Sequence, residues 1–203
     1  EWIVVDGGSS DGTLKKIQAA CVPSQCISEP DSGIADAWNK GLDLGSRNHI
    51  LILNAGDTYD PDFLETIVPH CDGTKIVCSH ARLISETGRS VGLFRAQPNK
   101  LARGMHLPHN WCAVPRRFYG ELGPYSHLQL AMDFEWFHRY YKRYGPQGFI
   151  VVERALGDYY LGGKSDVHYA ESFRANERIL IEHGTSPFIA ALYRLSYTTK
   201  RAL

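Results

Sequence analysis

Apolar strand segments and amphipathic helical segments alternate along the first third of the chain. Strands are expected at residues 2–5, 25–28, 49–53 and 75–79. Helices are expected at residues 13–20 and 34–44, and a further helix is expected to open at Pro61. Strands that alternate with helices through short loops build right-handed units around a parallel sheet. The order therefore predicts an α/β fold with a mostly parallel sheet flanked by helices.

The second half of the chain has a different pattern. Segments 81–85 and 90–95 flank a Glu-Thr-Gly-Arg turn and predict a hairpin. The elements expected after it are a helix over 128–144, a strand over 149–152, a helix over 165–183 and an amphipathic helix over 187–203. We therefore expect one mixed domain over residues 1–164, followed by a C-terminal helical extension over residues 165–203.

Composition excludes several classes of protein. The formal net charge is zero and no basic block occurs, so nucleic acid is not expected as a partner. The five cysteines contain no Cys-x-x-Cys pair, which favours free thiols in a reducing compartment and hence a cytoplasmic location. No apolar run reaches the roughly 18 residues that a membrane span needs.

Two acidic residues follow expected strands at the edge where ligands bind in open parallel sheets. Asp6 comes directly after the first strand, and Asp57 lies four residues after Leu53. Gly8 stands beside Asp6, where a glycine lets the backbone approach a ligand closely. Asp6 could accept hydrogen bonds from a nucleobase or ribose, and Asp57 could hold a hard divalent cation. Taken singly, each segment also fits a plain turn, with a helix cap in the first case.

Six segments in order carry a family resemblance. Residues 3–13 read IVVDGGSSDGT and resemble the VVDDGSTDGT signature of family 2 glycosyltransferases. The other matching segments are SEPDSGIADAWNKG at 28–41, LILNAGD at 51–57, the stretch from His109 to Tyr125 with its Arg-Arg pair, AMDFEW at 131–136 and GGKS at 162–165. The subgroup they resemble is typical of bacterial exopolysaccharide and O-antigen synthesis.

The resemblance implies a GT-A, Rossmann-like fold and an inverting transfer from a nucleoside-diphosphate sugar to a hydroxyl group. The acceptor would be a glycan or a lipid-linked sugar. Residues 1–80 would form the nucleotide-binding part and residues 81–164 the acceptor part. The family's first strand has no counterpart in this sequence, so the domain is expected to be truncated at its N-terminus. Gly7 also stands where the family has Asp.

The resemblance also assigns roles to individual residues. Asp133 would be the catalytic base and Glu135 the second choice for it. The residues placed at the nucleotide and donor sugar are Asp6, Gly8, Asp31, Asn39, Asp57 and His109. Because the loop reads Asn-Ala-Gly-Asp, Asp57 would be the protein's only carboxylate on a Mn²⁺ or Mg²⁺ ion, which diphosphate and water would otherwise hold.

Structural alternatives stand beside these roles. Asp133 could cap its helix, Asn39 could pack on a loop, and His109 could be a core residue. Four further side chains fit two interpretations. Arg116 and Arg117 could contact phosphate groups or lie on the surface, and Trp111 and Trp136 could stack on sugar rings or pack in the core.

Alternatives to an active transferase also remain open at this point. The chain could be an inactive remnant or a nucleotide-binding module, and a sugar nucleotidyltransferase would share the nucleotide-binding architecture. Helix 187–203 is basic at its tip and apolar on one face. It could rest on the inner face of the plasma membrane, pack on the core or dimerise.

Overall fold

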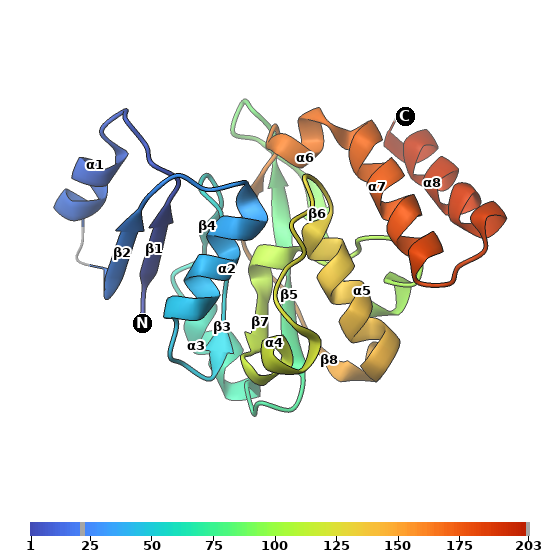
Figure 1. The fold of residues 1–203 in the computed structure, drawn as a ribbon, viewed down its shortest axis with the longest axis horizontal. Helices are drawn as coiled ribbons and strands as arrows, with labels where there is room; N and C mark the ends of the chain where they lie inside the picture. The colour runs from blue at the N-terminus through green and yellow to red at the C-terminus, as the bar shows by residue number, and fades with distance from the viewer. Residues whose placement is uncertain (21–22, 202–203) are drawn as a thin grey trace.

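The computed structural model describes residues 1–20 and 23–201 of the chain and divides the strands between two sheets (Figure 1). The smaller sheet pairs β1 (Ile3–Asp6) with β2 (Gln25–Ser28). The strands of the larger sheet are β3 (His49–Ile50), β4 (Thr58–Tyr59), β5 (Ile76–Ile84), β6 (Ser90–Phe94), β7 (Cys112–Pro115) and β8 (Phe149–Tyr160). Its order is β3, β7, β5, β8, β4, and β6 pairs with β5.

The direction of the strands differs in part from the expectation. The pairs β1–β2 and β5–β8 are parallel, whereas β3–β7, β4–β8, β5–β6 and β5–β7 are antiparallel. The mixed sheet flanked by helices is confirmed, but the expected parallel majority is wrong. Three antiparallel pairs account for this difference from the expected sheet. They are the hairpin β5–β6 and the pairs of the short strands, β3 with β7 and β4 with β8.

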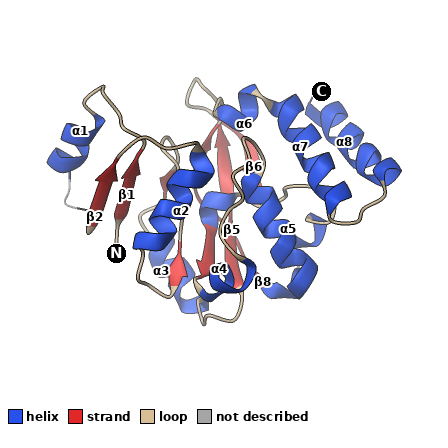
Figure 2. Ribbon diagram, viewed as in Figure 1, coloured by secondary structure: helices blue, strands red, loops and turns tan. Residues whose placement is uncertain are grey.

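Helices cover both faces of the larger sheet (Figure 2). The α-helices are α1 (Thr13–Ala20), α2 (Ile34–Leu44), α3 (Phe63–Ile67), α4 (Arg117–Leu122), α5 (Met132–Tyr144), α6 (Lys164–Val167), α7 (Tyr169–Glu182) and α8 (Pro187–Arg201). Single 3₁₀ turns occupy Val68–His70, Pro98–Lys100, His109–Trp111 and Pro146–Gly148. The helices α7 and α8 pack on each other, and α7 contacts α5.

Alternation along β5 divides the core into two layers. Ile76 and Cys78 point into a cluster that α5 fills with large aromatic side chains such as Trp136. Val77, between them, points into a second cluster with Phe63 of α3. This follows from strand geometry, in which successive side chains leave opposite faces. Both faces of β5 are therefore buried where it begins, which fits the apolar run Ile76-Val77-Cys78.

Five expected strands change their length. Segments 75–79 and 81–85 form one strand, β5, because it keeps a neighbour throughout, first β7 and then β6 on one side and β8 on the other. The strand expected over 149–152 extends to Tyr160 for the same reason. The strand expected over 49–53 shrinks to His49–Ile50, and Leu53 is 47% exposed. The strand expected over 90–95 ends at Phe94.

Helix boundaries are correct at α1 and α2 and differ elsewhere. The helix expected over 128–144 begins at Met132, because Ala131 is left-handed with a φ of 62° and cannot belong to the helix. The helix expected over 165–183 is interrupted at His168 and forms α6 and α7. The helix after Pro61 begins at Phe63. Of the helix expected over 187–203, residues 202 and 203 lie outside the described residues.

Free thiols are confirmed at the four described cysteines, which are Cys26, Cys71, Cys78 and Cys112. Cys21 lies outside the described residues. None of the helices in residues 1–20 and 23–201 combines the length and the apolar character that crossing a bilayer requires.

Candidate active site

The carboxylate of Asp6 organises the glycine-rich loop at the end of β1. Its Oδ2 accepts hydrogen bonds from Ser28 Oγ at 2.6 Å, Ser9 N at 2.9 Å and Gly8 N at 3.2 Å. These bonds, of which the one from Ser28 is the strongest, lower the pKa of Asp6 to about 2. Asp6 is therefore ionised at physiological pH. Because all three bonds fall on Oδ2, Oδ1 is the atom that can accept from a ligand.

Gly7 makes room for Asp31, which lies over the same loop. A Cβ atom at position 7 would lie 2.5 Å from Asp31 Oδ2. The other oxygen of Asp31 accepts from Gly33 N at 3.0 Å. Gly8 has a φ of 87°, which disfavours any residue with a side chain. The structure thus brings Asp6, Gly8 and Asp31 together, and the glycine that departs from the family pattern gives Asp31 its place.

Asp57 is fixed between two segments of the larger sheet. It precedes β4, which pairs with β8. Its Oδ1 accepts from Tyr160 N at 3.0 Å, and its Oδ2 accepts from the amide of Asn110. Burial raises the pKa of Asp57 above its ordinary value in spite of these bonds. The side chain is therefore held in one position while its negative charge remains poorly solvated.

The hydroxyl group of Tyr159 feels the charges of three carboxylates. Burial raises the pKa of Tyr159, and the negative charges of Asp166, Asp57 and Asp133 raise it further. Tyr159 Oη lies 3.4 Å from Asp166 Oδ2, which also accepts from Gly162 N at 3.2 Å. These acids come from the loop before β4, the first turn of α5 and helix α6. Tyr159, near the carboxyl end of β8, is therefore a side chain on which the charges of both the predicted metal ligand and the predicted base act.

Asp133 is the second residue of α5 and is the less constrained of the two candidate bases. Its Oδ1 accepts from the backbone N of Phe134 at 2.8 Å. Burial raises the pKa of the carboxyl group, which suits a group that must take up a proton near neutral pH. The position at the helix N-terminus favours its ionised form. The hydrogen bond to Phe134 N is local and does not tie Asp133 to a second structural element, so its carboxylate can turn toward a substrate.

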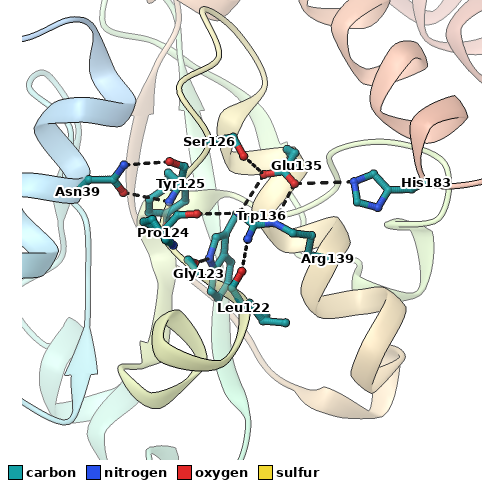
Figure 3. Close-up of polar contacts among 10 residues, drawn as sticks. All are labelled: Asn39, Leu122, Gly123, Pro124, Tyr125, Ser126, Glu135, Trp136, Arg139 and His183. Atoms are coloured by element: carbon teal, nitrogen blue, oxygen red, sulfur yellow. Dashed lines mark hydrogen bonds and ion pairs between the residues drawn. The ribbon is translucent and has the colours of Figure 1, made fainter.

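Glu135 is instead committed to a network on the opposite side of α5 (Figure 3). Its carboxylate accepts from Ser126 Oγ at 2.9 Å and from Arg139 Nη2 at 3.0 Å, and His183 Nε2 lies 3.7 Å away. Arg139 also donates to the carbonyl oxygens of Leu122 and Pro124. Glu135 is 8% exposed. This arrangement favours Asp133 over Glu135 as the base, in the order expected from the sequence.

Replacing Glu135 by Gln should lower the free energy of unfolding by about 3 kcal/mol, because it leaves Arg139 without its charged partner in a mostly buried site. Urea unfolding measures the difference. The matched control is Glu29→Gln, since Glu29 is 58% exposed in its ion pair with Lys40 and should change stability by less than about 1 kcal/mol. Equal effects of the two variants would contradict a structural role for Glu135.

Asn39 and His109 are occupied by contacts within the protein. Asn39 Nδ2 donates to Tyr125 O at 2.9 Å, and Asn39 Oδ1 accepts from Tyr125 N at 2.9 Å (Figure 3). His109 Nε2 lies 2.9 Å from Tyr125 Oη, and the ring stacks edge-on against Trp38 at 4.5 Å. Burial lowers the pKa of His109 to about 3, so it is neutral at physiological pH. These contacts favour the packing alternatives for both residues.

The tryptophans and arginines separate in the same way. Trp111 and Trp136 are fully buried, which rules out stacking on a sugar ring. Arg117 donates to Gly73 O at 2.9 Å on the surface. Arg116 lines a cavity at the end of the larger sheet opposite to Asp57. The structure therefore favours core packing for Trp111 and Trp136 and a surface position for Arg117.

Sequence reasoning missed Asn110, Tyr159 and Asp166. Asn110 directly follows His109, so the same motif could have pointed to it. Asp166 directly follows the Gly-Gly-Lys-Ser segment. Tyr159 carried no signal, because the strand expected over 149–152 stopped before it.

A mixed α/β sheet with glycine-supported and metal-compatible carboxylates at its strand ends is the architecture of enzymes that bind nucleotide-linked substrates. Within this class, the sequence pattern described as "Glycosyl transferase family 2" matches residues 1–144. The chain belongs to this family.

Relatives and solved structures agree with this assignment. A "PGL/p-HBAD biosynthesis glycosyltransferase" of Mycobacterium bovis (strain BCG / Pasteur 1173P2) is 29% identical over 144 residues, which cover 67% of this chain and 55% of the relative. A protein of the same description from Mycobacterium tuberculosis (strain ATCC 25177 / H37Ra) matches equally. The chain thus spans about half the length of these curated relatives.

Two solved structures share the fold. S. aureus TarS 1–349 in complex with UDP-GlcNAc superposes with a TM-score of 0.62 at 12% identity, over 97% of this chain and 62% of that one. Glucosyl-3-phosphoglycerate synthase from Mycobacterium tuberculosis, in complex with Mn²⁺, UDP-glucose and phosphoglyceric acid, gives 0.58 at 16% identity, over 91% and 69% of the two chains. The GT-A-like α/β fold expected from the sequence is confirmed.

Proposed function

We propose that this domain transfers a sugar from a nucleoside-diphosphate donor to a hydroxyl group of a glycan or lipid-linked acceptor, with inversion at the anomeric carbon. The observation that carries the proposal is the family 2 match of a chain in which the charges of Asp57, Asp133 and Asp166 all act on the hydroxyl group of Tyr159, near the carboxyl end of β8. Relatives described as PGL/p-HBAD biosynthesis glycosyltransferases, and solved neighbours in complex with UDP-GlcNAc or UDP-glucose, support the substrate class.

The proposed reaction uses two sets of residues. Asp6 and Asp31 bind the nucleotide at the end of β1, and Asp6 offers Oδ1 as an ionised acceptor. Asp133 removes the proton from the acceptor hydroxyl as that oxygen attacks the anomeric carbon. The bond from the anomeric carbon to the diphosphate oxygen breaks on the opposite face, and the nucleoside diphosphate leaves. Holding donor and acceptor in line supplies much of the rate enhancement.

A divalent cation fits the residues near Asp57. Burial raises the pKa of Asp57, and the negative charge of Asp166 raises it further. A nearby cation would remove this cost of ionisation. Among the described residues no group of three or more His, Cys, Asp or Glu side chains forms a complete metal site. This set suits Mn²⁺ or Mg²⁺ bound largely through diphosphate and water, where it would stabilise the charge of the leaving group.

Thermal unfolding with UDP, GDP and dTDP, each with and without Mn²⁺, tests the proposal. One nucleotide should raise the Tm only in the presence of Mn²⁺, because binding to the native state alone stabilises it. Asp57→Asn should abolish this Mn²⁺-dependent shift. Because burial raises the pKa of Asp57, proton competition should also weaken the shift in the wild type as the pH falls into the acidic range. A nucleotide shift without sugar transfer would instead support the binding-module alternative.

We also propose that α8 contacts a membrane surface, which would suit a lipid-linked acceptor in the synthesis of surface glycans at the inner face of the plasma membrane. The face of α8 that packs on α7 contains the buried Ala190 and Arg194, whose Nε lies 2.7 Å from Glu177. Four large apolar side chains of α8 are exposed: Phe188, Ile189, Leu192 and Leu195.

The double variant Phe188→Ser, Leu192→Ser should bind anionic phospholipid vesicles at least tenfold more weakly, since each apolar side chain contributes about 1.5–3 kcal/mol when it is fully buried. Co-sedimentation with vesicles measures the affinity, and Val91→Ser on β6 is an exposed apolar control. Two results would contradict the membrane contact: unchanged vesicle binding of the double variant, or a wild-type dimer that the double variant no longer forms.

A further inference from the structure

Two hydrogen bonds that run in opposite directions join the 3₁₀ turn His109–Trp111 to the segment that carries Asp57. The side-chain amide of Asn110 donates from Nδ2 to Asp57 Oδ2. In return, Tyr59 Oη donates to the carbonyl oxygen of Asn110 at 2.6 Å. Tyr59 lies two residues after Asp57, and its ring stacks on Phe63 at 3.9 Å. The backbone of Asn110 is therefore anchored to the same segment whose carboxylate its side chain holds.

The amide of Asn110 is buried, yet only one of its two ends has a partner. The residue is 3% exposed, and its Oδ1 accepts no hydrogen bond from the residues that the structure describes. A buried polar atom without a partner costs about 1–3 kcal/mol, and folded proteins contain few such atoms.

Asn39 shows the arrangement expected of an asparagine with a purely structural role. Its Nδ2 donates to Tyr125 O and its Oδ1 accepts from Tyr125 N, both at 2.9 Å. Asn110 differs because it uses the donor end alone, on a carboxylate, and leaves the acceptor end unsatisfied. Stability therefore does not account for an asparagine at position 110, whereas a need for an uncharged donor beside Asp57 does.

The Asp57 carboxylate is held at both of its oxygens. Oδ1 accepts from Tyr160 N of β8 at 3.0 Å, and Oδ2 accepts from Asn110. An ionised carboxylate has about four acceptor positions, so two bonds leave room for a further partner. An arginine or lysine in place of Asn110 would pair with Asp57 and compete with a cation. The amide fixes the orientation of the carboxylate without adding a charge of its own.

We propose that Asn110 is a positioning residue for the cation and diphosphate of the sugar donor, and that it acts by holding the Asp57 carboxylate in one orientation. The inference rests on the proposed sugar transfer, in which Asp57 meets the cation. Residues that orient a metal-binding side chain typically change metal affinity 10–100-fold when they are replaced. One oriented carboxylate attracts a free divalent ion weakly, so the cation binds together with a nucleoside diphosphate, whose oxygens supply further ligands.

The variants Asn110→Ala and Asn110→Asp test the proposal, because they should change binding in opposite directions. Asn110→Ala removes the donor. Its affinity for the nucleotide that binds the wild type should fall at least tenfold with Mn²⁺ and stay within a factor of about two without Mn²⁺. Asn110→Asp places a second carboxylate beside Asp57. Its affinity for Mn²⁺ alone, measured at pH 7.5 by water proton relaxation, should exceed that of the wild type at least tenfold.

The matched control is Asn99→Asp, which changes an exposed asparagine in the same way and should leave both affinities unchanged. Weaker Mn²⁺ binding in Asn110→Asp, or Mn²⁺ binding equal to that of the wild type, would overturn the positioning role. Should Asn110→Asp fail to fold, the selective loss in Asn110→Ala decides the question, and equal losses with and without Mn²⁺ would point to a structural role instead.

Failure of this inference can be told apart from failure of the proposed function. If no nucleotide binds the wild type in the presence of Mn²⁺, the proposed sugar transfer is contradicted. The affinity of Asn110→Asp for Mn²⁺ alone still shows whether Asn110 acts on the Asp57 carboxylate, because that measurement needs no nucleotide. If the wild type binds a nucleotide with Mn²⁺ and both Asn110 variants match it, the transfer stands and the role of Asn110 falls.

Discussion

Asp133→Asn should lower kcat for sugar transfer by about 10³-fold, because a positioned general base contributes about 10²–10⁴-fold and the amide cannot accept the acceptor's proton. Donor affinity should remain within a factor of about two, since the proposed donor ligands Asp6 and Asp31 lie on other elements. Steady-state kinetics and a nucleotide titration measure the two quantities. Retained turnover would remove Asp133 from the chemistry.

The same substitution should stabilise the fold at neutral pH. Burial raises the pKa of Asp133 above its ordinary value of 3.8, so the native state holds the proton more tightly than the unfolded chain does. Stability then falls as the pH rises from about 3.8 through the raised pKa, and at pH 7 the full cost of the buried charge is present. Asparagine removes that cost, so the variant should gain on the order of 1 kcal/mol at pH 7, and the gain should vanish toward pH 4.

Wild-type kcat/KM should also depend on the ionisation of Asp133, but it should rise with pH where stability falls. Only the ionised carboxylate can accept a proton, so activity should fall as the pH drops below the raised pKa of Asp133. The acid limb of the profile should therefore lie above the ordinary range of an aspartate. An acid limb at pH 4 or below would contradict the base assignment.

Glu135→Gln provides the contrast, because Glu135 lies two residues away on the same helix. It should lose stability and keep most of its turnover per folded molecule, whereas Asp133→Asn should gain stability and lose turnover. On helix α5, the paired carboxylate of Glu135 would serve stability, and the poorly solvated carboxylate of Asp133 would serve catalysis. Enzymes commonly tolerate such a destabilising charge where the reaction needs it.

The sequence was informative wherever the determining contacts are local. The bounds of α1 and α2 follow from helical periodicity, and Asp11, just before α1, accepts from the backbone and hydroxyl of Thr13. The loop at Asp6 was likewise readable, because its glycines and serine lie next to one another in the chain. The family resemblance added the position of Asp133, which spacing alone could not supply.

Long-range contacts decided the features that the sequence did not predict. Asn39 is occupied by the backbone of Tyr125, 86 residues away, and no local pattern marks such a contact. The start of α5 depends on the left-handed conformation of Ala131, which intrinsic helix propensity argues against. Strand β8 extends past residue 152 because β5 continues beside it. For Asn39 and β8, a partner from elsewhere in the chain overrides the local preference.

Gly157→Ala should lower the free energy of unfolding by about 3 kcal/mol, the upper range for added methyl groups in packed interiors. Gly157 lies on β8 opposite Tyr59. An added Cβ would come closer than 3.0 Å, which real Cβ atoms essentially never do, both to the carbonyl oxygen of Thr58 and to Nε1 of Trp111. The first of these is backbone and the second belongs to a fully buried ring, so neither can move without parting β4 from β8.

The substitution should also reach the candidate metal ligand. Thr58 directly follows Asp57, whose Oδ1 accepts from Tyr160 N on the same strand as Gly157. Moving β4 breaks this bond, so the Mn²⁺-dependent nucleotide shift should fall together with stability. Gly120→Ala is the matched control, because a Cβ at position 120 in α4 meets no atom within 4 Å and should stabilise the helix by up to about 1 kcal/mol. If Gly157→Ala matched wild type in urea unfolding and in nucleotide titration, the close approach of β4 to β8 would not be what positions Asp57.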